Sequence, residues 1–140
     1  NVDDVGYASA AAAGLTAGTI TPSGASVGTK QGFSIIKYEG NGTSGAQLPH
    51  GLTQAPDFFI VKNLEETESW GVYHKTETGT RYAFLNSSNA FSTSSALWNN
   101  TDPTSSVFTL GDYNGTNKNT IDAYIWEMAK SKQNIINIFE

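Results

Sequence analysis

Cysteine is absent from the 140-residue chain, and charged side chains make up only 15% of it. Without cysteine the chain can form neither disulfides nor thiolate metal sites. The net charge of −5 argues against a nucleic-acid partner, because binding to a phosphate backbone relies on a basic stripe. No apolar run approaches the roughly 18 residues that a membrane span requires. We therefore expect neither a nucleic-acid partner nor a membrane span.

Short polar residues take the place of the missing charges. Ser, Thr, Asn and Gly together make up 56 of the 140 residues, and sixteen residues are aromatic. Short polar side chains suit turns and exposed strand faces, whereas Lys, Glu and Arg, which usually coat helices, are scarce. The aromatic side chains supply large buried areas for a core. This composition favours one β-rich domain.

Residues 1–32 differ in composition from the rest of the chain. They contain one Tyr, no Phe or Trp, and many Ala, Gly, Ser and Thr residues. The run 8–15 is compatible with two helical turns, with Ser9 as the N-cap and Gly14 as the stop. The segment has too little apolar mass for a core of its own. We therefore predict an extended Ala/Gly/Thr-rich connector over 1–32, followed by a domain over 33–140.

From Phe33 onward, apolar and polar residues alternate with period two, which predicts β-strands. The strongest strand is expected at 57–64, where apolar residues occupy both faces and predict a central strand covered on both sides. Other strands are expected at 33–39, 69–75, 81–86, 105–110, 121–128 and 135–139. Residues 48–52 are expected to form a short strand or a turn, and residues 96–98 a short strand or a corner. Turn signals separate these short strands at intervals typical of all-β folds. The pattern predicts an antiparallel β-sandwich, jelly-roll-like in type.

The residue types that carry hydrolytic chemistry do not form a recognisable motif. His50 lies in a Pro-His-Gly turn and His74 lies in an expected strand, so packing or a cross-strand hydrogen bond is favoured over catalysis. Asp122 and Glu127 are five residues apart in one strand and therefore lie on opposite faces. We expect no enzyme activity, no catalytic residue and no cofactor.

A metal site is also not expected. Asp112, Asn114, Asn117 and Asp122 surround a Gly-containing loop and have oxygen ligands of the kind that calcium prefers. Their spacing is not that of an EF-hand loop. Asn and Asp residues in turns usually bond their own backbone instead.

Two aromatic residues in turn-rich stretches are candidates for carbohydrate binding. Sugar sites stack a ring on an aromatic side chain and surround it with short polar groups on loops. The candidate residues are Trp98, Asn99, Asn100, Tyr113 and Asn114. The alternative for Trp98 and Tyr113 is burial in the core. For Trp70 and Trp126, which lie inside expected strands, a role as core anchors is favoured.

Several segments, taken in order over about residues 26–130, resemble a known family. They are Gly32–Ile36 with Tyr38, Gly40–Thr43, Pro49–Leu52, Ala55–Asp57, Ile60–Asn63, Trp70, Val72–Lys75, Leu85–Asn86, Trp98–Thr101, Pro103–Phe108 and Tyr124–Glu127. Their order and spacing resemble an uncharacterised β-sandwich domain family found in tail-fibre and appendage proteins of marine tailed bacteriophages. The chain departs from that family in its acidic loop 65–68, and in ending where the family often continues into a further sandwich unit.

The resemblance implies a structural and adhesive role and assigns no catalytic residue. We expect a module of a phage virion appendage, such as a tail fibre, that packs with other appendage subunits as a homotrimer and contacts host surface glycans. Three alternatives stay open. The first is a capsid decoration or head-fibre domain, the second is a depolymerase-type carbohydrate-active enzyme module, and the third is a secreted bacterial adhesin domain. Exposure of Trp98 and Tyr113 would favour a receptor binder, and burial of both would favour a purely structural module.

Overall fold

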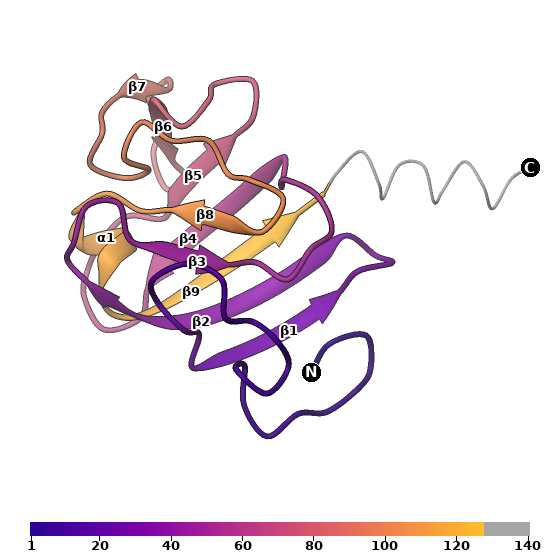
Figure 1. Ribbon diagram of the computed structural model, residues 1–140. Coiled ribbons are helices and arrows are strands. Elements are labelled where there is room, and N and C mark those ends of the chain that lie inside the picture. Colours follow the sequence, from indigo (N-terminus) through magenta and orange to yellow (C-terminus); the bar gives the residue numbers. More distant parts are fainter. Residues whose placement is uncertain (128–140) are drawn as a thin grey trace, which may run out of the picture.

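The computed structural model describes residues 1–127, and nearly all of their regular structure is β-strand (Figure 1). The strands are β1 (Gly24–Gly28), β2 (Phe33–Asn41), β3 (Gln47–Pro49), β4 (Phe58–Asn63), β5 (Gly71–His74), β6 (Arg81–Phe84), β7 (Ser92–Thr93), β8 (Val107–Thr109) and β9 (Lys118–Trp126). A single helical turn, α1 (Asn114–Asn117), precedes β9. The named strands pair in antiparallel fashion, which confirms the expected all-β, sandwich-like fold.

Seven strands form one sheet in the order β1-β2-β9-β4-β5-β6-β7, and β3 pairs with β8 in a second, two-stranded sheet. In the large sheet β9 lies between β2 and β4 and is hydrogen-bonded to both. The central position of β4 agrees with the sequence-based prediction. None of the helices in the described part of the chain is long and apolar enough to cross a membrane. The strand expected at 135–139 and residue 128 of the expected last strand lie outside the described residues.

The core lies between the large sheet and a second layer made of β3, β8 and loops. We call the sheet face toward this layer the inner face. Its buried side chains are Ile36, Tyr38, Phe59, Val61, Tyr73, Ile121, Ala123 and Ile125. Phe108 of β8 contacts this face through Tyr38 and Phe59, with ring centroids 6.3 and 5.3 Å apart. Strict alternation along β2, β4 and β9 places these residues on one side of the sheet.

Residues 1–32 are part of the domain rather than the extended connector that the composition suggested. They contain strand β1, which pairs with β2 along its whole length. Ala10, Leu15 and Val27 are buried in the main core cluster. The expected helix at 8–15 is a series of turns, in which the Ser9 hydroxyl accepts a hydrogen bond from the backbone N–H of Ala12 at 3.0 Å. A few buried aliphatic side chains anchor this segment because the large sheet offers them a ready-made apolar surface.

Candidate functional site

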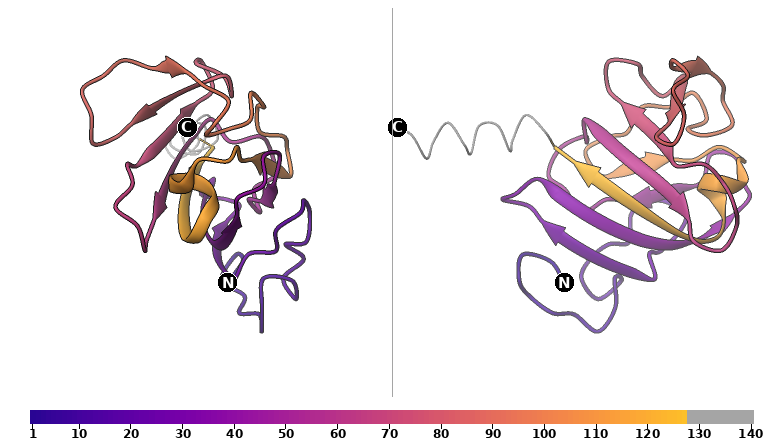
Figure 2. Two further views of the ribbon diagram at one scale, coloured as in Figure 1. Left: turned by 90° about the vertical axis from the view of Figure 1, so that its left-hand side faces the viewer. Right: turned by 180° about the vertical axis from the view of Figure 1, so that it is seen from behind.

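Within residues 1–127, no second layer covers the other face of the large sheet, which we call the outer face. Seen from behind, no described segment crosses it (Figure 2, right). Its side chains are those that alternate with the buried ones, so on β4 they are Phe58, Ile60 and Lys62, all half-buried. The sequence-based expectation that β4 is covered on both sides is therefore wrong. The apolar residues on both sides of β4 are explained by an apolar face that is open to solvent, and not by burial under a third layer.

One row across the outer face is aromatic. The strand registers align Phe33, Trp126, Phe58 and His74 on β2, β9, β4 and β5. Ring centroids are 5.1 Å apart for Phe33 and Trp126, 5.2 Å for Trp126 and Phe58, and 6.2 Å for Phe58 and His74. Tilted and edge contacts at these distances stabilise cross-strand aromatic pairs. We call these four residues the aromatic row.

The next row is apolar, and the third combines charges with an exposed tryptophan. Ile35, Tyr124, Ile60, Val72 and Ala83 are aligned by register beside the aromatic row. The third row has Lys37, Asp122 and Lys62, in that order, on β2, β9 and β4.

Trp70 extends the third row beyond β4. It stands just before β5, and the Lys62 Nζ lies 6.0 Å from the centre of its ring. Trp70 is 37% exposed, Leu64 is 47% exposed and Leu85 is 59% exposed. The backbone N–H of Leu85 donates to the carbonyl of Trp70, which places Leu85 beside the end of this row. The outer face is therefore apolar across most of the sheet.

A shallow depression of about 410 Å³ lies on the β1 side of the outer face. It is lined by Gly24, Ser26, Ile35, Lys37 and Asp122, together with Ala25. The depression forms because the side chains of β1 are small, whereas those of the neighbouring strands β2 and β9 are larger and project further from the sheet. The Oδ1 atom of Asp122 is buried and has no hydrogen-bond partner within residues 1–127.

Trp98 does not belong to any exposed site. Its side chain is fully buried and packs edge-on against Phe59 and Tyr73, with ring centroids 4.9 and 6.4 Å apart. Gly71 lies beside this ring: a Cβ atom there would be 3.6 Å from Trp98, an ordinary contact, and 3.1 Å from Leu97, a tight one. The expectation that Trp98 stacks on a sugar is therefore wrong. Its turn-rich flanks fold over the part of the inner face that β3 and β8 leave open.

The two remaining tryptophans lie on the outer face instead of in the core. Trp126 is half-buried in the aromatic row, and Trp70 is partly exposed, so the prediction that they are core anchors is also wrong. Trp126 and Asp122 occupy alternate positions of β9 on the same side. The charged Asp122 on the same side of the strand as Trp126 was the available sequence signal that this side faces solvent.

Tyr113 is half-buried at the end of the sheet near β6. Its hydroxyl donates to the Glu68 carboxylate at 2.9 Å, and burial together with this hydrogen bond raises the pKa of Tyr113 to about 12. Tyr113 lies 5.9 Å from Phe84, which lies 5.1 Å from Tyr82. Asn99 is half-buried, while Asn100 and Asn114 are exposed. For these four predicted residues, sugar binding stays a prediction.

His50 has a structural role in the Pro-His-Gly turn. It is fully buried, its Nδ1 accepts from the backbone N–H of Leu52 at 3.0 Å, and its Nε2 lies 2.9 Å from the carbonyl oxygen of Thr104. These two bonds require the neutral ring with the proton on Nε2. Burial lowers the pKa of His50, which agrees with a neutral ring.

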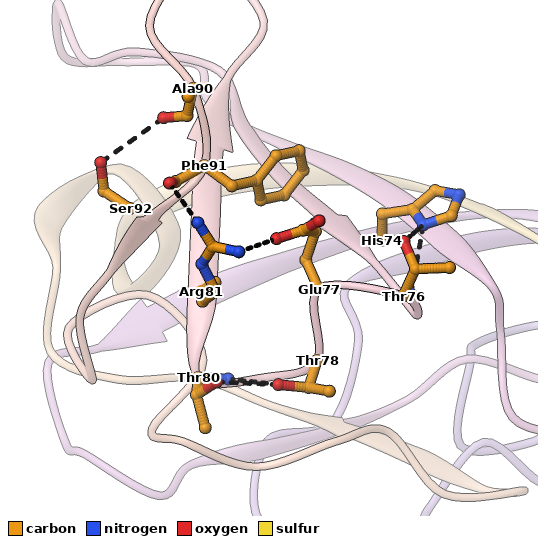
Figure 3. A network of polar contacts seen from close by, with 9 residues as sticks. All are labelled: His74, Thr76, Glu77, Thr78, Thr80, Arg81, Ala90, Phe91 and Ser92. Atoms are coloured by element: carbon orange, nitrogen blue, oxygen red, sulfur yellow. Dashed lines mark hydrogen bonds and ion pairs between the residues drawn. The ribbon is translucent and has the colours of Figure 1, made fainter.

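His74 lies beside a network of polar contacts at the β5–β6 turn (Figure 3). Its Nδ1 is 2.8 Å from the Thr76 hydroxyl, so its hydrogen bond is local rather than across strands. In the same network the Arg81 guanidinium pairs with Glu77 and donates to the carbonyl of Phe91 at 2.7 Å. These contacts hold the turn and the loop before β7 in place.

The carboxylates and amides considered for chemistry are dispersed. Asp122 points to the outer face, while Glu127 is buried and its Oε1 accepts from the N–H groups of Thr53 and Gln54. The side chain of Asn117 is fully engaged in the interior, as described below. Within residues 1–127, no group of three or more His, Asp or Glu side chains is placed to hold a metal ion.

The outer face is the main candidate surface that sequence reasoning missed. Its rows come from β2, β9, β4 and β5, which are far apart in the chain, and their order in the sheet is not visible in the sequence. The sequence does carry one signal of this face. Phe33 and Ile35, Phe58 and Ile60, and Tyr124 and Trp126 are each two residues apart, so the members of each pair lie on the same side of their strand.

Comparison with known proteins gives a family but no activity. A search of curated proteins and a search of solved structures both gave no match. Residues 6–132 match the model of a family described as a domain of unknown function, DUF7483. The match includes most of residues 1–32, in agreement with their place in the folded domain. The chain therefore belongs to the DUF7483 family.

Proposed function

We propose that this chain is a structural and adhesive module of a multi-subunit external appendage, such as the tail fibre of a bacteriophage, and that the outer face is its packing surface. The observation that carries the proposal is the open apolar outer face with its aromatic row. Contiguous apolar surfaces of this extent mark sites where another protein packs. The resemblance of the chain to tail-fibre domains supplies the kind of assembly.

The character of the outer face supports packing against a protein more than binding of a small ligand. Small-molecule sites are concave and enclose most of their ligand. The aromatic and apolar rows instead lie along the strands of one sheet, and the depression beside them is shallow. Few side chains on this face carry a charge, as is typical of the centre of a protein interface.

Contact with a host glycan is a second candidate, favoured by the rings of Tyr82, Phe84 and Tyr113. These three side chains are half-buried and lie close together at the β6 end of the molecule. Exposed Asn114 and the Glu68 carboxylate bonded to Tyr113 supply polar groups beside the rings. A glycan array probed with the wild-type chain and with Tyr113→Ala tests this role, which requires a signal that the variant loses.

Immunogold labelling of purified phage particles tests the appendage role directly. Antibodies raised against residues 1–127 should label the tail fibres or another external appendage in electron micrographs. Antibodies depleted on the purified chain provide the control. Absence of specific label from particles that contain the chain, as established by mass spectrometry, would rule out display on an external appendage.

A further inference from the structure

We propose that the outer face packs against the outer face of a second copy of this chain, related by a two-fold axis that runs parallel to the strands between β9 and β4. This inference rests on the proposed function only in taking the outer face as a packing surface. It names the partner and the register of the contact. The argument has three parts, which concern the size of the face, its charges and its symmetry.

The size of the face suits a reversible dimer. Six strands spaced about 4.8 Å apart span roughly 24 Å, and three rows, each about 7 Å wide, cover roughly 20 Å, on the order of 500 Å² per copy. A pair would then bury about 1,000 Å² in total, near the lower limit for specific protein interfaces. Two apolar sheet faces are also a natural match, because sheets stack about 10 Å apart with their side chains interdigitated. A pair of this size should dissociate measurably on dilution.

The charges of the outer face are self-complementary. The third row presents Lys37, Asp122 and Lys62 in a positive, negative, positive order. The Oδ1 atom of Asp122 is buried and lacks a hydrogen-bond partner among the described residues. A partner with charges of one sign would oppose part of this row. A second copy brings both signs, so that Asp122 of each copy can meet a lysine of the other.

The centre of the face fixes the symmetry. Within the described residues the seventh strand, β7, pairs only with β6 and carries no residue of the three rows, so the face spans β1, β2, β9, β4, β5 and β6, and its midpoint lies between β9 and β4. A two-fold axis there places β9 of one copy over β4 of the other. Asp122 then faces Lys62 of the second copy, and Lys37 faces its Trp70, which is a cation–π pairing.

The aromatic and apolar rows match under the same operation. Trp126 faces Phe58 of the second copy, and Tyr124 faces its Ile60. Because the contact is isologous, each of these pairs occurs twice. Residue pairs that are adjacent on β9 and β4 within one sheet, such as Trp126 and Phe58, thus also face each other across the interface. This pair differs from the trimer expected from the sequence.

A charge-swap mixing experiment tests the register. The variant Asp122→Lys places Lys against Lys twice in a homodimer, and the variant Lys62→Asp places Asp against Asp twice. A mixture of the two variants restores both opposite-charge contacts in a heterodimer. Molar mass by light scattering over a dilution series should give two wild-type chains at high concentration, each variant at least tenfold weaker in self-association, and recovery in the mixture. Circular dichroism checks that each variant is folded.

Other outcomes overturn the inference. A wild-type chain that is monomeric at all concentrations, a mass of three chains, or a dimer unaffected by the two variants would each contradict the proposed pair. Singly weakened variants that do not recover on mixing would contradict the register. The labelling experiment is independent. If the appendages are labelled but the chain is monomeric, the proposed function stands and the outer face is assigned to a different protein. If the chain forms a charge-dependent dimer but no appendage is labelled, the proposed pair stands and the appendage role does not.

Discussion

Buried polar side chains in this domain differ in whether their hydrogen bonds are satisfied. Both ring nitrogens of His50 are engaged with backbone groups. The hydroxyl of Ser34 on β2 is fully buried and has no hydrogen-bond partner within the described residues. An unsatisfied buried hydroxyl lowers stability, because the group gives up its bonds to water without replacement. Single substitutions at these two sites should therefore have opposite effects.

Ser34→Ala should stabilise the domain. The change removes a buried, unbonded hydroxyl and leaves the methylene in place, so the free energy of unfolding should rise by about 1 kcal/mol. Urea denaturation followed by tryptophan fluorescence measures the change. Ser26→Ala on the exposed side of β1 is the control and should have an effect within about 0.5 kcal/mol. A loss of stability in Ser34→Ala would show that the hydroxyl has a partner.

His50 should make stability depend on pH in the mildly acidic range. Burial lowers its pKa in the folded state, so below the unfolded-state pKa of about 6.5 the unfolded chain binds more protons than the folded chain. The contribution of neutral His50 is thus complete above pH of about 6.5 and is lost as the pH falls toward the folded-state pKa. Its slope is at most about 1.4 kcal/mol per pH unit.

Thermal unfolding between pH 5 and 8 checks this prediction on His50→Gln and on His74→Gln as a matched control. As the pH falls from 8 to 5, the wild-type chain and His74→Gln should lose stability. His50→Gln should be less stable than the wild-type chain at pH 8, and its stability should change less with pH. Equal slopes in all three proteins would assign the dependence to other groups.

At the residue scale, sequence reasoning ranked the burial of the three tryptophans wrongly. Trp98 was a candidate for exposure because of its turn-rich flanks, with burial in the core as the alternative, and it is the most deeply buried of the three. Local sequence reports on backbone conformation, but the burial of a loop side chain depends on which surface the loop covers. Gly71 and Phe59, which receive Trp98, are 27 and 39 residues away. In contrast, the turn role of His50 was foreseen, because Pro and Gly flank it.

At the scale of elements, one asparagine links two connections. The carbonyl of the Asn117 side chain accepts from the N–H of Asn41, and its amide donates to the carbonyls of Thr43 and Gly111. The residue thus ties the β2–β3 connection to the β8–β9 connection. Its side chain is fully buried. The helical turn α1 ends at this residue, so its position is fixed by these bonds rather than by helix propensity.

Asn117→Ala should destabilise the domain by about 2–4 kcal/mol, because three hydrogen bonds to backbone groups are lost at once. Asn114→Ala, in the same helical turn but exposed, is the matched control and should change stability by less than about 0.5 kcal/mol. Chemical denaturation measures both. Similar small effects in the two variants would mean that water replaces the side chain at Asn117.

The strands were largely predictable, and their exceptions have one cause. β2, β4 and β9 were foreseen because each has alternating or continuous apolar residues of β-branched and aromatic type. β1 was missed, since its sequence Gly24–Gly28 contains small residues and resembles a linker. It forms because the edge of β2 offers a complete row of backbone partners. Strand formation at an edge depends on the neighbour as much as on propensity.

At the scale of the whole molecule, residues 1–32 complete the core. Leu15 is only 7% exposed and belongs to the main cluster. Leu15→Ala should lower the free energy of unfolding by about 2–4 kcal/mol, as expected for a buried leucine. Thr16→Ala, exposed at the next position, is the control. A neutral Leu15→Ala would restore the interpretation of this segment as a connector, and denaturation curves distinguish the two results.

The fold class followed from composition and periodicity, whereas the outer face, the proposed packing surface, did not. The outer face exists only because β9 pairs with both β2 and β4 and brings Trp126 between Phe33 and Phe58. No local pattern encodes that order. An apolar outer face also looks the same in sequence as a face buried by a third layer, and this explains the error for β4.

The central place of β9 has a consequence for synthesis. During translation β2 and β4 leave the ribosome well before the strand that joins them, so for much of that time each has an unpaired edge. The large sheet can close only after Trp126 has emerged, and a chain that terminates before β9 lacks the link between its two halves. Such truncated products should be removed by proteases rather than persist as partly folded domains. Quality control during synthesis is thus built into the order of the strands.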